Sequence, residues 1–367
     1  MKLTIDSQEF ADAMSFVARF SPKRPTSIIL GGVMMRVENG QLHLSVFDFQ
    51  NAASTALAAE VEADGSALVH AATLQQWASK LPRKPLTIEA EDSTLKLRCG
   101  PVRASLPLMP IDDYPNVDLV SQPVVTIPGA IFDDLVQRTA FAAATDADPA
   151  LLTAVNLVAG NDSLTMSATD RYRVAHMPVK CATSGSFEAS IPALALRETA
   201  KAFATSDEVE IGLTGNDSLT FKGDRGMIFS RPLVGKFPPV DRLFPSEVEK
   251  HAVLSAEVVS EATLRAALAL QPRGAVRFSF SEDSCTVEGT SEGKGMVEEF
   301  EVAFDGGELD INLRPQFLVD GLGACRSEDV HMWFMPGGSA GKPGPVMLFG
   351  GDGFRYLLQP NLLLREG

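Results

Sequence analysis

The sequence predicts an α+β protein made of three copies of one domain, each with two helices packed on antiparallel sheets. Helical segments with similar N-terminal residues begin at Ser7, Pro128 and Ser255, and each is followed by a second helical segment. Between the helices, polar turns precede strands in which apolar and polar residues alternate, the pattern of hairpin-connected antiparallel strands. The repeat is about 120 residues long, far longer than the repeating unit of a solenoid, so it indicates three whole domains.

The first helix of each repeat is predicted from apolar residues at helical spacing. These residues are Phe10, Met14 and Val17 in the first repeat, Ile131, Leu135 and Phe141 in the second, and Val258, Leu264 and Leu268 in the third. Ser7 and Ser255 are predicted N-caps, because a serine hydroxyl can accept a hydrogen bond from a free amide of the first turn. Pro128 suits the first turn of its helix, since proline lacks the amide that would be unpaired there.

The second helices are predicted to begin at Ala71, Pro192 and Arg314, which lie 121 and 122 residues apart. Alternating strands are predicted in 38–48, 160–170 and 281–291, and a strand–turn–strand pattern follows each second helix. Segments 109–123 and 236–250 are rich in proline and acidic residues, as domain boundaries tend to be. The predicted domains are therefore 1–120, 124–246 and 247–367.

The composition excludes several classes of protein. The 367-residue chain is 45% hydrophobic and carries a formal net charge of −15. Its four cysteines form no CxxC pair and its five histidines show no metal-ligand spacing, so no disulfide framework, metal or cofactor is predicted. The first residues lack the apolar core of a signal peptide, and no apolar run reaches the ~18 residues of a membrane span, which predicts a cytoplasmic protein that does not bind membranes.

Enzymatic activity is not predicted. The sequence has no Walker loop, no GxGxxG before a helix, no HExxH and no GxSxG. Asp146, Asp148 and Asp170 would be the candidates for a metal-dependent nuclease, but the first two lie in a loop without a convergent histidine or glutamate. No residue is therefore assigned a catalytic role.

Basic residues gather toward the C-terminal ends of the predicted helices and in the loops that follow them. A cation near a helix C-terminus complements the helix dipole, which is enough to explain any single one. Their recurrence in all three repeats predicts instead a basic lining on an acidic protein, able to attract a phosphate backbone without reading its sequence. The predicted DNA-facing residues are Arg19, Lys23, Arg24, Lys80, Arg83, Lys84, Arg138, Arg197, Lys201, Arg265 and Arg273.

One cluster at a strand end occurs in a single repeat. The strand that ends at Asp170 is followed by Arg171, Tyr172 and Arg173, whereas the corresponding positions after Asp48 and near Ser291 lack this triplet. A feature found in one of three repeats is not required by the fold. The triplet therefore indicates a local specialisation of the middle repeat.

Five stretches along the chain form a series. They are KRPTSIILGGVMM (23–35), RASLPLMPIDDYPNVD (103–118), ATDRYRVA (168–175), GKFPPVDRLFP (235–245) and FRYLLQP (354–360). In this order, and on a threefold repeat, they resemble the bacterial DNA polymerase III beta subunit family, the sliding clamps. The resemblance covers nearly the whole chain.

The resemblance implies a ring. Two chains would join head to tail, and three clamp domains from each would form a six-domain ring around duplex DNA. The function implied is that of a DNA polymerase processivity factor, a non-catalytic subunit whose partners are replicative and repair polymerases and the clamp loader. Its DNA contacts would be weak and independent of sequence so that the ring slides, and Arg24 is the first candidate for such a contact.

The resemblance also implies a pocket between the second and third domains that binds short linear peptides of polymerases and repair proteins. Apolar walls would hold Leu or Phe side chains of an extended peptide, and arginines would fix its polar groups. Tyr172 and Arg173 are the leading candidates, and Arg171 is expected to face solvent. Carried over by motif, the pocket residues would be Leu152, Thr169, Tyr172, Arg173, Val174, Pro238, Arg242, Leu243, Leu358, Gln359 and Pro360.

Three features depart from the family pattern. Gln359 replaces a methionine in the C-terminal segment, Ala104 stands where the family often has an aromatic residue at the dimer contact, and the loop 145–150 is acidic. These departures leave open a divergent paralogue or a mobile-element version of the clamp. The alternative function is a monomeric clamp-like adaptor or decoy that binds peptides without encircling DNA.

Overall fold

The computed structural model describes residues 1–115, 120–244, 250–337 and 344–361, which form two compact units. The first unit contains residues 1–133 with 181–232, and the second contains 134–180 with 233–367. The predicted middle repeat therefore contributes chain to both units. Parts of the two predicted linkers, 116–119 and 245–249, and the C-terminal residues 362–367 lie outside the described residues.

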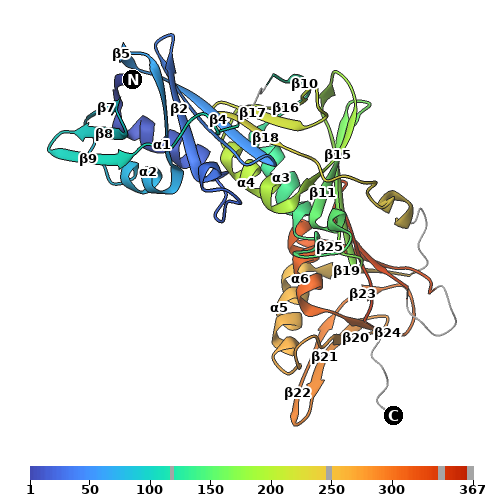
Figure 1. Cartoon of the computed structure of the whole chain (residues 1–367). Coiled ribbons are helices and arrows are strands. Elements are labelled where there is room, and N and C mark those ends of the chain that lie inside the picture. The colour runs from blue at the N-terminus through green and yellow to red at the C-terminus, as the bar shows by residue number, and fades with distance from the viewer. Residues whose placement is uncertain (116–119, 245–249, 338–343, 362–367) are drawn as a thin grey trace. The chain divides into compact units, whose positions relative to one another are not determined.

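The first unit holds three complete helices and the start of a fourth (Figure 1). The helices are α1 (Ser7–Ala18), α2 (Ala71–Ala78), α4 (Ala193–Phe203) and the first residues of α3 (Gly129–Ala140). The strands are β1 (Lys2–Asp6), β2 (Gly32–Glu38), β3 (Gln41–Phe47), β4 (Asn51–Ala58), β5 (Glu60–Ala63), β6 (Gly65–His70), β7 (Pro85–Glu91), β8 (Thr94–Cys99), β9 (Val102–Pro107), β10 (Gln122–Ile127), β14 (Ala182–Thr183), β15 (Phe187–Pro192), β16 (Val209–Leu213), β17 (Leu219–Gly223) and β18 (Gly226–Ser230).

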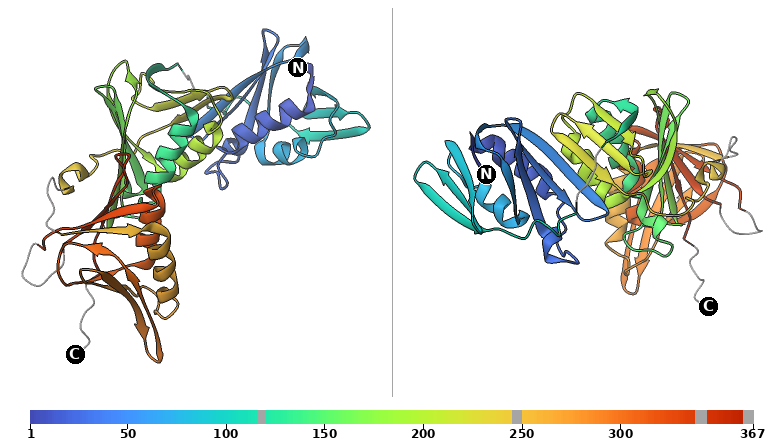
Figure 2. Two further views of the ribbon diagram at one scale, coloured as in Figure 1. Left: turned by 180° about the vertical axis from the view of Figure 1, so that it is seen from behind. Right: turned by 45° about the horizontal axis from the view of Figure 1, so that its top comes forward.

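Two antiparallel sheets organise the first unit. One has the strand order β5-β1-β7-β8-β9, and the other has the order β14-β10-β16-β17-β18-β4-β3-β2-β6. The larger sheet joins two repeats, because β18 pairs with β4 from Met227↔Ser54 to Ser230↔Asn51. Helices α1 and α2 lie side by side (Figure 2), and α1 buries Phe10, Met14 and Val17 completely, as the helical spacing predicts.

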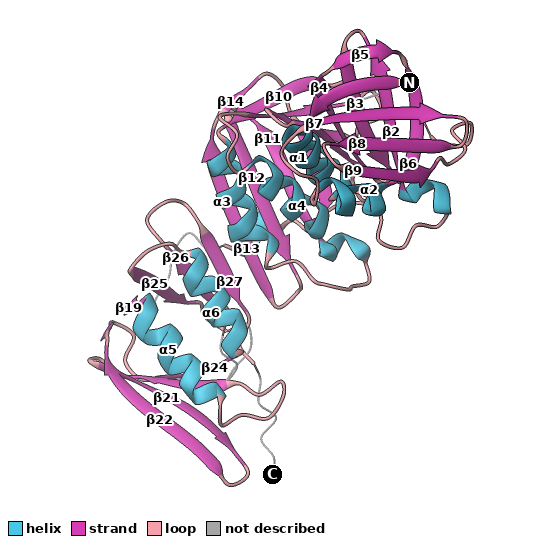
Figure 3. Cartoon of the chain, turned by 90° about the vertical axis from the view of Figure 1, so that its left-hand side faces the viewer, coloured by secondary structure: helices cyan, strands magenta, loops and turns pink. Residues whose placement is uncertain are grey.

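The second unit contains helices α5 (Ala256–Ala267) and α6 (Pro315–Ala324), which lie side by side (Figure 3). Within this unit the strands lie in two antiparallel sheets, in the orders β11-β12-β13-β27-β26-β25-β19-β23 and β22-β21-β20-β24. The larger sheet again joins two repeats, through pairing of β13 with β27. The strands are β11 (Ala154–Gly160), β12 (Ser163–Thr169), β13 (Arg173–Lys180), β19 (Lys250–Ser255), β20 (Val276–Phe280), β21 (Ser284–Ser291), β22 (Lys294–Glu301), β23 (Ala303–Phe304), β24 (Leu309–Leu313), β25 (Asp329–Phe334), β26 (Val346–Phe349) and β27 (Arg355–Leu358).

All six predicted helices are present, and the predicted antiparallel α+β architecture is confirmed. Three short 3-10 helices lie in the connections: η1 (Ile28–Gly31), η2 (Ala150–Thr153) and η3 (Val240–Leu243). Among the described residues, no helix combines the length and apolar character needed to cross a membrane.

One predicted cap is wrong and another is right. Asp6, not Ser7, caps α1, because its carboxylate accepts hydrogen bonds from the amides of Gln8 and Glu9. The Ser7 hydroxyl donates instead to the Pro82 carbonyl at 2.8 Å. Ser255 does cap α5, where its hydroxyl accepts a hydrogen bond from the Val258 amide.

Candidate functional site

The Arg-Tyr-Arg triplet forms a pre-organised turn between β12 and β13. The Asp170 carboxylate accepts hydrogen bonds from the amides of Tyr172 and Arg173 at 3.0 and 3.1 Å. The Thr169 hydroxyl donates to the Arg173 carbonyl at 2.7 Å and accepts from the Arg171 amide at 3.2 Å. Side chains that bond to backbone two residues ahead fix such turns without help from a regular ladder. The loop is therefore held in one shape before any ligand binds.

Arg173 turns inward and is satisfied by the protein itself. Its guanidinium donates to Asp170 at 2.9 Å and to Asp320 on α6 at 2.7 Å, and it lies 4.2 Å from the centre of the Phe317 ring. Only 11% of its side chain is exposed. Burial raises the pKa of the neighbouring Tyr356 phenol, so this group stays neutral and donates to the Phe317 carbonyl at 2.9 Å. Arg173 thus joins β13 to α6 and shapes the wall of the site.

Tyr172 points the other way and is 53% exposed. The Arg314 guanidinium lies 4.9 Å from the centre of its ring, a cation–π contact at the N-cap of α6. Arg171 is also exposed and donates to the Asp148 carbonyl at 2.7 Å. The outward surface of the loop is therefore an aromatic ring paired with an arginine that the sequence motifs had not singled out.

The C-terminal segment lies beside this loop. In the β13–β27 pair, Arg173 is opposite Leu358 and Val174 is opposite Leu357. The backbone amide of Gln359 donates to the Tyr172 carbonyl at 2.8 Å. Leu358 and Pro360 are buried, and Gln359 is exposed. The structure thus brings the central motif and the C-terminal motif together, with the amide side chain that replaces methionine at the surface.

The predicted linker segment packs on the same sheet. Val174 forms an apolar cluster with Phe237, Val240, Phe244, Met347 and Leu357. This cluster anchors η3, which leaves Arg242 and Leu243 exposed, the latter by 49%. Asp241 approaches His176 at 3.3 Å, and burial lowers the pKa of this imidazole. Pro238 is half-buried beside the cluster.

Two further predicted pocket residues, Thr169 and Leu152, are buried, as Val174, Leu358 and Pro360 are. Thr169 and Leu152 are 5% and 4% exposed. Thr169 acts through its hydrogen bonds within the turn, and Leu152 lies on η2, where its carbonyl accepts from the Ala144 amide at 2.8 Å. The described hydrogen bonds do not connect Leu152 to the Arg-Tyr-Arg turn or to η3.

Sequence reasoning missed four residues of this site. Arg314, Phe317, Asp320 and Phe141 all contact the Arg-Tyr-Arg turn. Arg314 and Asp320 are polar residues at the start and in the interior of a largely apolar helix segment, RPQFLVDGLGA. That composition is a signal for a site, but it does not reveal the partner, because the Arg173–Asp320 pair spans 147 positions of the chain.

The basic residues of the first unit lie at the surface. Arg19, Lys23, Arg24, Lys80, Arg83, Lys84, Arg197 and Lys201 are all exposed. A cavity of about 810 Å³ is lined by Arg19 and Lys23 together with residues of α2 and α4. The carboxylate of Glu198 partly balances the positive charge of these residues, because it lies 4.0 Å from Arg19 and 3.4 Å from Lys201.

In the second unit, Arg138 does not face solvent, so its prediction as a DNA-facing residue is wrong. Its side chain is 2% exposed, and its guanidinium donates to the Ala324 carbonyl at 2.7 Å and to both oxygens of Asp352. Arg273 is exposed. Arg265 is exposed too, but it is held by Glu298 and Glu261 at 2.7 and 3.0 Å, so much of its charge is already balanced.

No group of three or more His, Cys, Asp or Glu side chains placed to hold a metal ion occurs in the described part of the chain. The buried thiols of Cys285 and Cys325 are kept protonated, because burial raises the pKa of each to about 12. The arrangement therefore offers surfaces for binding, namely an aromatic–cationic turn with an apolar cluster in one unit and exposed basic helix ends in the other.

Comparison with known proteins assigns the whole chain to one family. The DNA polymerase III beta subunit models match residues 1–118 as the N-terminal domain, 126–239 as the central domain and 241–341 as the C-terminal domain. The beta sliding clamp of Streptomyces coelicolor is 32% identical, over 98% of this chain and 99% of that protein. The beta sliding clamp of Micrococcus luteus is 31% identical, over 78% of this chain and 94% of that protein.

Solved structures show the same fold. The DNA polymerase III subunit beta of Pseudomonas aeruginosa superposes with a TM-score of 0.92 at 23% identity, covering 99% of this chain and all of that one. The sliding clamp of Bacillus subtilis gives a TM-score of 0.92 at 22% identity and covers 99% of both chains. Three clamp-type domains follow one another along this chain.

Proposed function

The chain belongs to the DNA polymerase III beta subunit family, and we propose that it closes head to tail with a second copy to form a ring around duplex DNA. As a member of this family it is a sliding clamp, a non-catalytic processivity subunit that works with DNA and with DNA polymerase. The observation that carries the ring is that two edge strands of opposite charge, one in each unit, have no partner strand among the residues that the structure describes.

The first edge is β9, the last strand of the five-stranded sheet. Arg103 on β9 is exposed, and it lies opposite Arg98 on β8, so this edge is basic. Ala104, where the family often has an aromatic residue, is half-buried on the same strand. An unpaired edge presents free amides and carbonyls that a strand of another chain can pair with.

The second edge is β22, the last strand of the four-stranded sheet. It carries Glu299 and Glu301, and also Glu298, whose charge is balanced by Arg265. Val297 on this strand is 65% exposed, and Leu264 and Leu268 at the end of α5, which packs on β22, are 48% and 77% exposed. The edge is therefore acidic with an apolar margin. Two different patches that fit each other make a heterologous contact, and such contacts give a closed ring when the rotation closes.

The exposed basic residues of the first unit suit the inner surface of such a ring. Lys and Arg side chains that neutralise phosphates give affinity without sequence preference, which a sliding protein requires. Arg24 is exposed in the loop between α1 and η1 and remains our first candidate for a DNA contact. The carboxylates beside Arg19, Lys201 and Arg265 keep the attraction weak.

Loading onto a circle tests the ring. The protein is placed on a nicked circular plasmid with a clamp loader and ATP, isolated by gel filtration, and the plasmid is then cut once. Retention on the circle and release after cutting are expected, because a closed ring can leave only at a free end. Retention that is the same on cut and uncut plasmid would show that binding is not topological.

The Arg-Tyr-Arg turn, η3 and the C-terminal segment are proposed as the docking pocket for linear peptides of replicative and repair polymerases and of the clamp loader. Tyr172, Leu243 and Gln359 are exposed around the apolar cluster that contains Val174, so an extended peptide can meet both apolar and polar groups. We place this activity in the cytoplasm, where the replication machinery works.

Replacing Tyr172 by alanine is expected to weaken binding of a fluorescent peptide that carries Leu and Phe by about tenfold. The change removes an exposed aromatic ring and its cation–π contact with Arg314, which keeps its contact with Phe317, a loss of about 1–2 kcal/mol. Fluorescence polarisation measures the dissociation constant. Arg171→Ala, on the same loop, is the matched control and should leave the affinity unchanged. Equal affinity for Tyr172→Ala and the parent protein would show that the pocket has been placed wrongly.

A further inference from the structure

Aromatic rings and guanidinium groups alternate beside the Arg-Tyr-Arg turn. Each arginine contacts the ring before it and the ring after it in the series, which is Phe141, Arg173, Phe317, Arg314 and Tyr172. The four distances from guanidinium carbon to ring centre are, in this order, 5.5, 4.2, 5.2 and 4.9 Å, within the range of cation–π contacts. This arginine–aromatic stack joins α6 to the turn, so its arginines are held in place before a peptide arrives.

The two arginines of the stack differ in their hydrogen bonds. Arg173 donates to Asp170 at 2.9 Å and to Asp320 at 2.7 Å. Arg314 is partly exposed, and its side chain makes no ion pair or hydrogen bond with any residue that the structure describes. A guanidinium has five N–H donors in its plane and no acceptor. Because the faces of Arg314 rest on two rings, its donors remain available to a ligand at the edge of the group.

Arg314 is also an unfavourable residue for the start of α6. It is the N-cap of this helix and makes no side-chain cap hydrogen bond. Ser, Thr, Asp or Asn would accept a hydrogen bond from the free amides of the first turn, whereas arginine only donates. Its positive charge lies at the positive end of the helix dipole. A residue that breaks these local rules is expected where a binding site needs it.

A hollow of about 290 Å³ lies beside Arg314, bordered by the end of α5, the loop 270–274 and the first residues of α6. Its charged lining residues are Arg273 and Arg314, and no carboxylate of a described residue lines it. Arg273 is exposed and has no ion-pair partner in the described part of the chain. Asp170 and Asp320 share Arg173, so three arginines meet two carboxylates across the stack and the hollow.

The acidic loop 145–150 reaches the same turn through its main chain. The Asp148 carbonyl accepts the hydrogen bond from Arg171, and among the described residues no ion pair joins Asp146 or Asp148 to Arg314. The charge of Arg171 offsets one of these two carboxylates. Recognition at Arg314 therefore depends on its free donors and its immediate lining, and not on the net charge of the wider surface.

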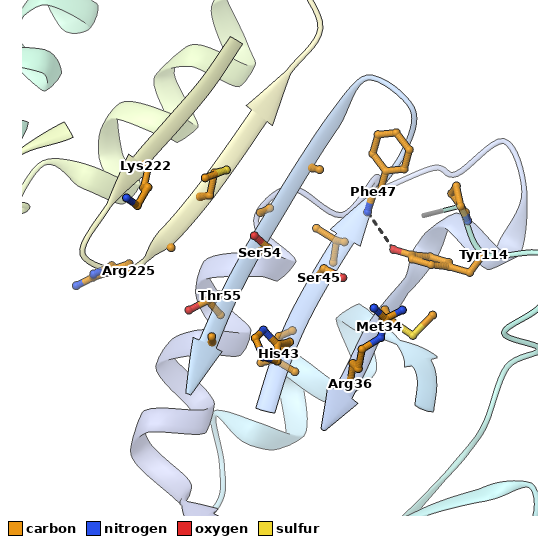
Figure 4. A pocket seen from close by; sticks show the side chains of 18 of the residues that line it. Met34, Arg36, His43, Ser45, Phe47, Ser54, Thr55, Tyr114, Lys222 and Arg225 are labelled. Carbon is orange, nitrogen blue, oxygen red and sulfur yellow. Dashed lines mark hydrogen bonds between the residues drawn. The ribbon is translucent and has the colours of Figure 1, made fainter. Parts of the chain in front are cut away.

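The larger hollow of the first unit, about 550 Å³ beside β2, β3, β4 and the β17–β18 turn, differs in this respect (Figure 4). Its Lys222 is paired with Glu210 at 3.1 Å. The lining charges without an ion-pair partner among the described residues are two of each sign, namely Arg36, Arg225, Glu38 and Asp224. Charge therefore selects no ligand there, whereas the hollow beside Arg314 has arginines alone.

We propose that Arg314 is a specificity residue of the docking pocket and binds an acidic side chain of the peptide, close to the Leu or Phe that the pocket holds. In the docking pocket proposed above, on which this role depends, Tyr172 meets the peptide. A carboxylate accepts two parallel hydrogen bonds from the edge of a guanidinium. An extended peptide advances about 3.3 Å per residue, and the guanidinium carbon lies 4.9 Å from the centre of the Tyr172 ring. The acidic residue is therefore expected about two positions from the side chain that covers Tyr172.

Three labelled peptides with capped ends test this role on the full-length protein. The neutral peptide is fluorescein-labelled Gln-Ala-Leu-Phe-Ala-Gln, and each of the other two carries glutamate in place of one glutamine, at the first or at the last position. Both placements are made because the peptide can run in either direction past Tyr172. One glutamate peptide is expected to bind about tenfold more tightly than the neutral peptide, as charge-assisted hydrogen bonds at a partly exposed site allow. Fluorescence polarisation measures the three dissociation constants, and the gain should shrink as salt is raised.

Arg314→Asn separates specificity from structure. Asparagine can cap α6, so the helix keeps its start while the guanidinium is lost. The tenfold preference for glutamate is expected to fall below about twofold, the residue of a lost charge pair. A residue that only supports the structure would weaken the glutamate and neutral peptides equally and leave the preference as it was. Arg326→Asn is the matched control, because Arg326 lies just beyond the other end of α6, is 54% exposed and has a φ of +52°, which asparagine tolerates.

The outcomes distinguish this role from the docking pocket itself. Equal binding of all three peptides to the parent protein would overturn the role of Arg314 and leave the docking pocket standing. A glutamate preference that survives in Arg314→Asn, or that disappears equally in Arg326→Asn, would also overturn it. Failure of all three peptides to bind the parent protein would overturn both the role of Arg314 and the docking pocket.

Discussion

Replacing Val297 and Leu268 together by aspartate is expected to convert the protein from a dimer into a monomer of 39.3 kDa. Both side chains are exposed in the single chain, by 65% and 77%, at the edge strand β22 and at the end of α5. Burial of each in an interface would contribute about 1.5–3 kcal/mol, and aspartate removes this gain. The new carboxylate at position 297 would also stand beside Glu298, where it would add repulsion between like charges.

Light scattering at micromolar concentration measures the outcome, and the plasmid-retention experiment extends it. The double variant should fail to remain on circular DNA even though its basic residues are intact, because an open half-ring can leave the DNA sideways. Val234→Asp is the matched control, since Val234 is 99% exposed but lies on neither edge strand. A parent protein that is monomeric at these concentrations would contradict the ring and favour the peptide-binding adaptor that does not encircle DNA.

Helices and strand patterns could be predicted because they depend on neighbours in the sequence. The spacing of Phe10, Met14 and Val17 defines one buried face, and the structure confirms that face. The N-cap of α1 was harder to predict, because Asp6 and Ser7 are both good capping residues. The Ser7 hydroxyl is taken by Pro82 and Lys84, which lie 75 and 77 positions away, and no local rule reports that contact.

The functional residues show the same difference between local patterns, which can be predicted, and long-range contacts, which cannot. The motifs identified the Arg-Tyr-Arg turn, but Arg173 was expected to meet a ligand, and in the structure it meets Asp170 and Asp320. The pairing of strands from neighbouring repeats, β18 with β4 and β13 with β27, could not be predicted either. The alternation of apolar and polar residues along a strand does not depend on which strand it pairs with.

Arg138 is an arginine near a helix end that the sequence pattern predicted to be exposed and that tertiary packing buries. It lies in the last turn of α3, as the other predicted DNA-facing arginines lie near helix ends, yet Asp352 and the Ala324 carbonyl hold it in a buried site. Arg138→Ala is expected to lower the free energy of unfolding of the second unit by about 3 kcal/mol, the low end for breaking a buried ion pair, because Asp352 can regain water. Urea unfolding measures the change, and DNA binding should stay as it was.

The pH dependence of this loss separates the ion pair from simple packing. The hydrogen bond from Arg138 lowers the pKa of Asp352 below its ordinary value of 3.8, so the stabilisation is fully present above that pH and disappears as the pH falls through the folded-state pKa. The difference between parent and variant should therefore shrink below about pH 4. Arg326→Ala is the matched control, since Arg326 is 54% exposed at 3.6 Å from Asp134 and should cost less than about 1 kcal/mol. A loss from Arg138→Ala that is the same at pH 7 and pH 3 would show that the cavity, and not the charge pair, accounts for the stability.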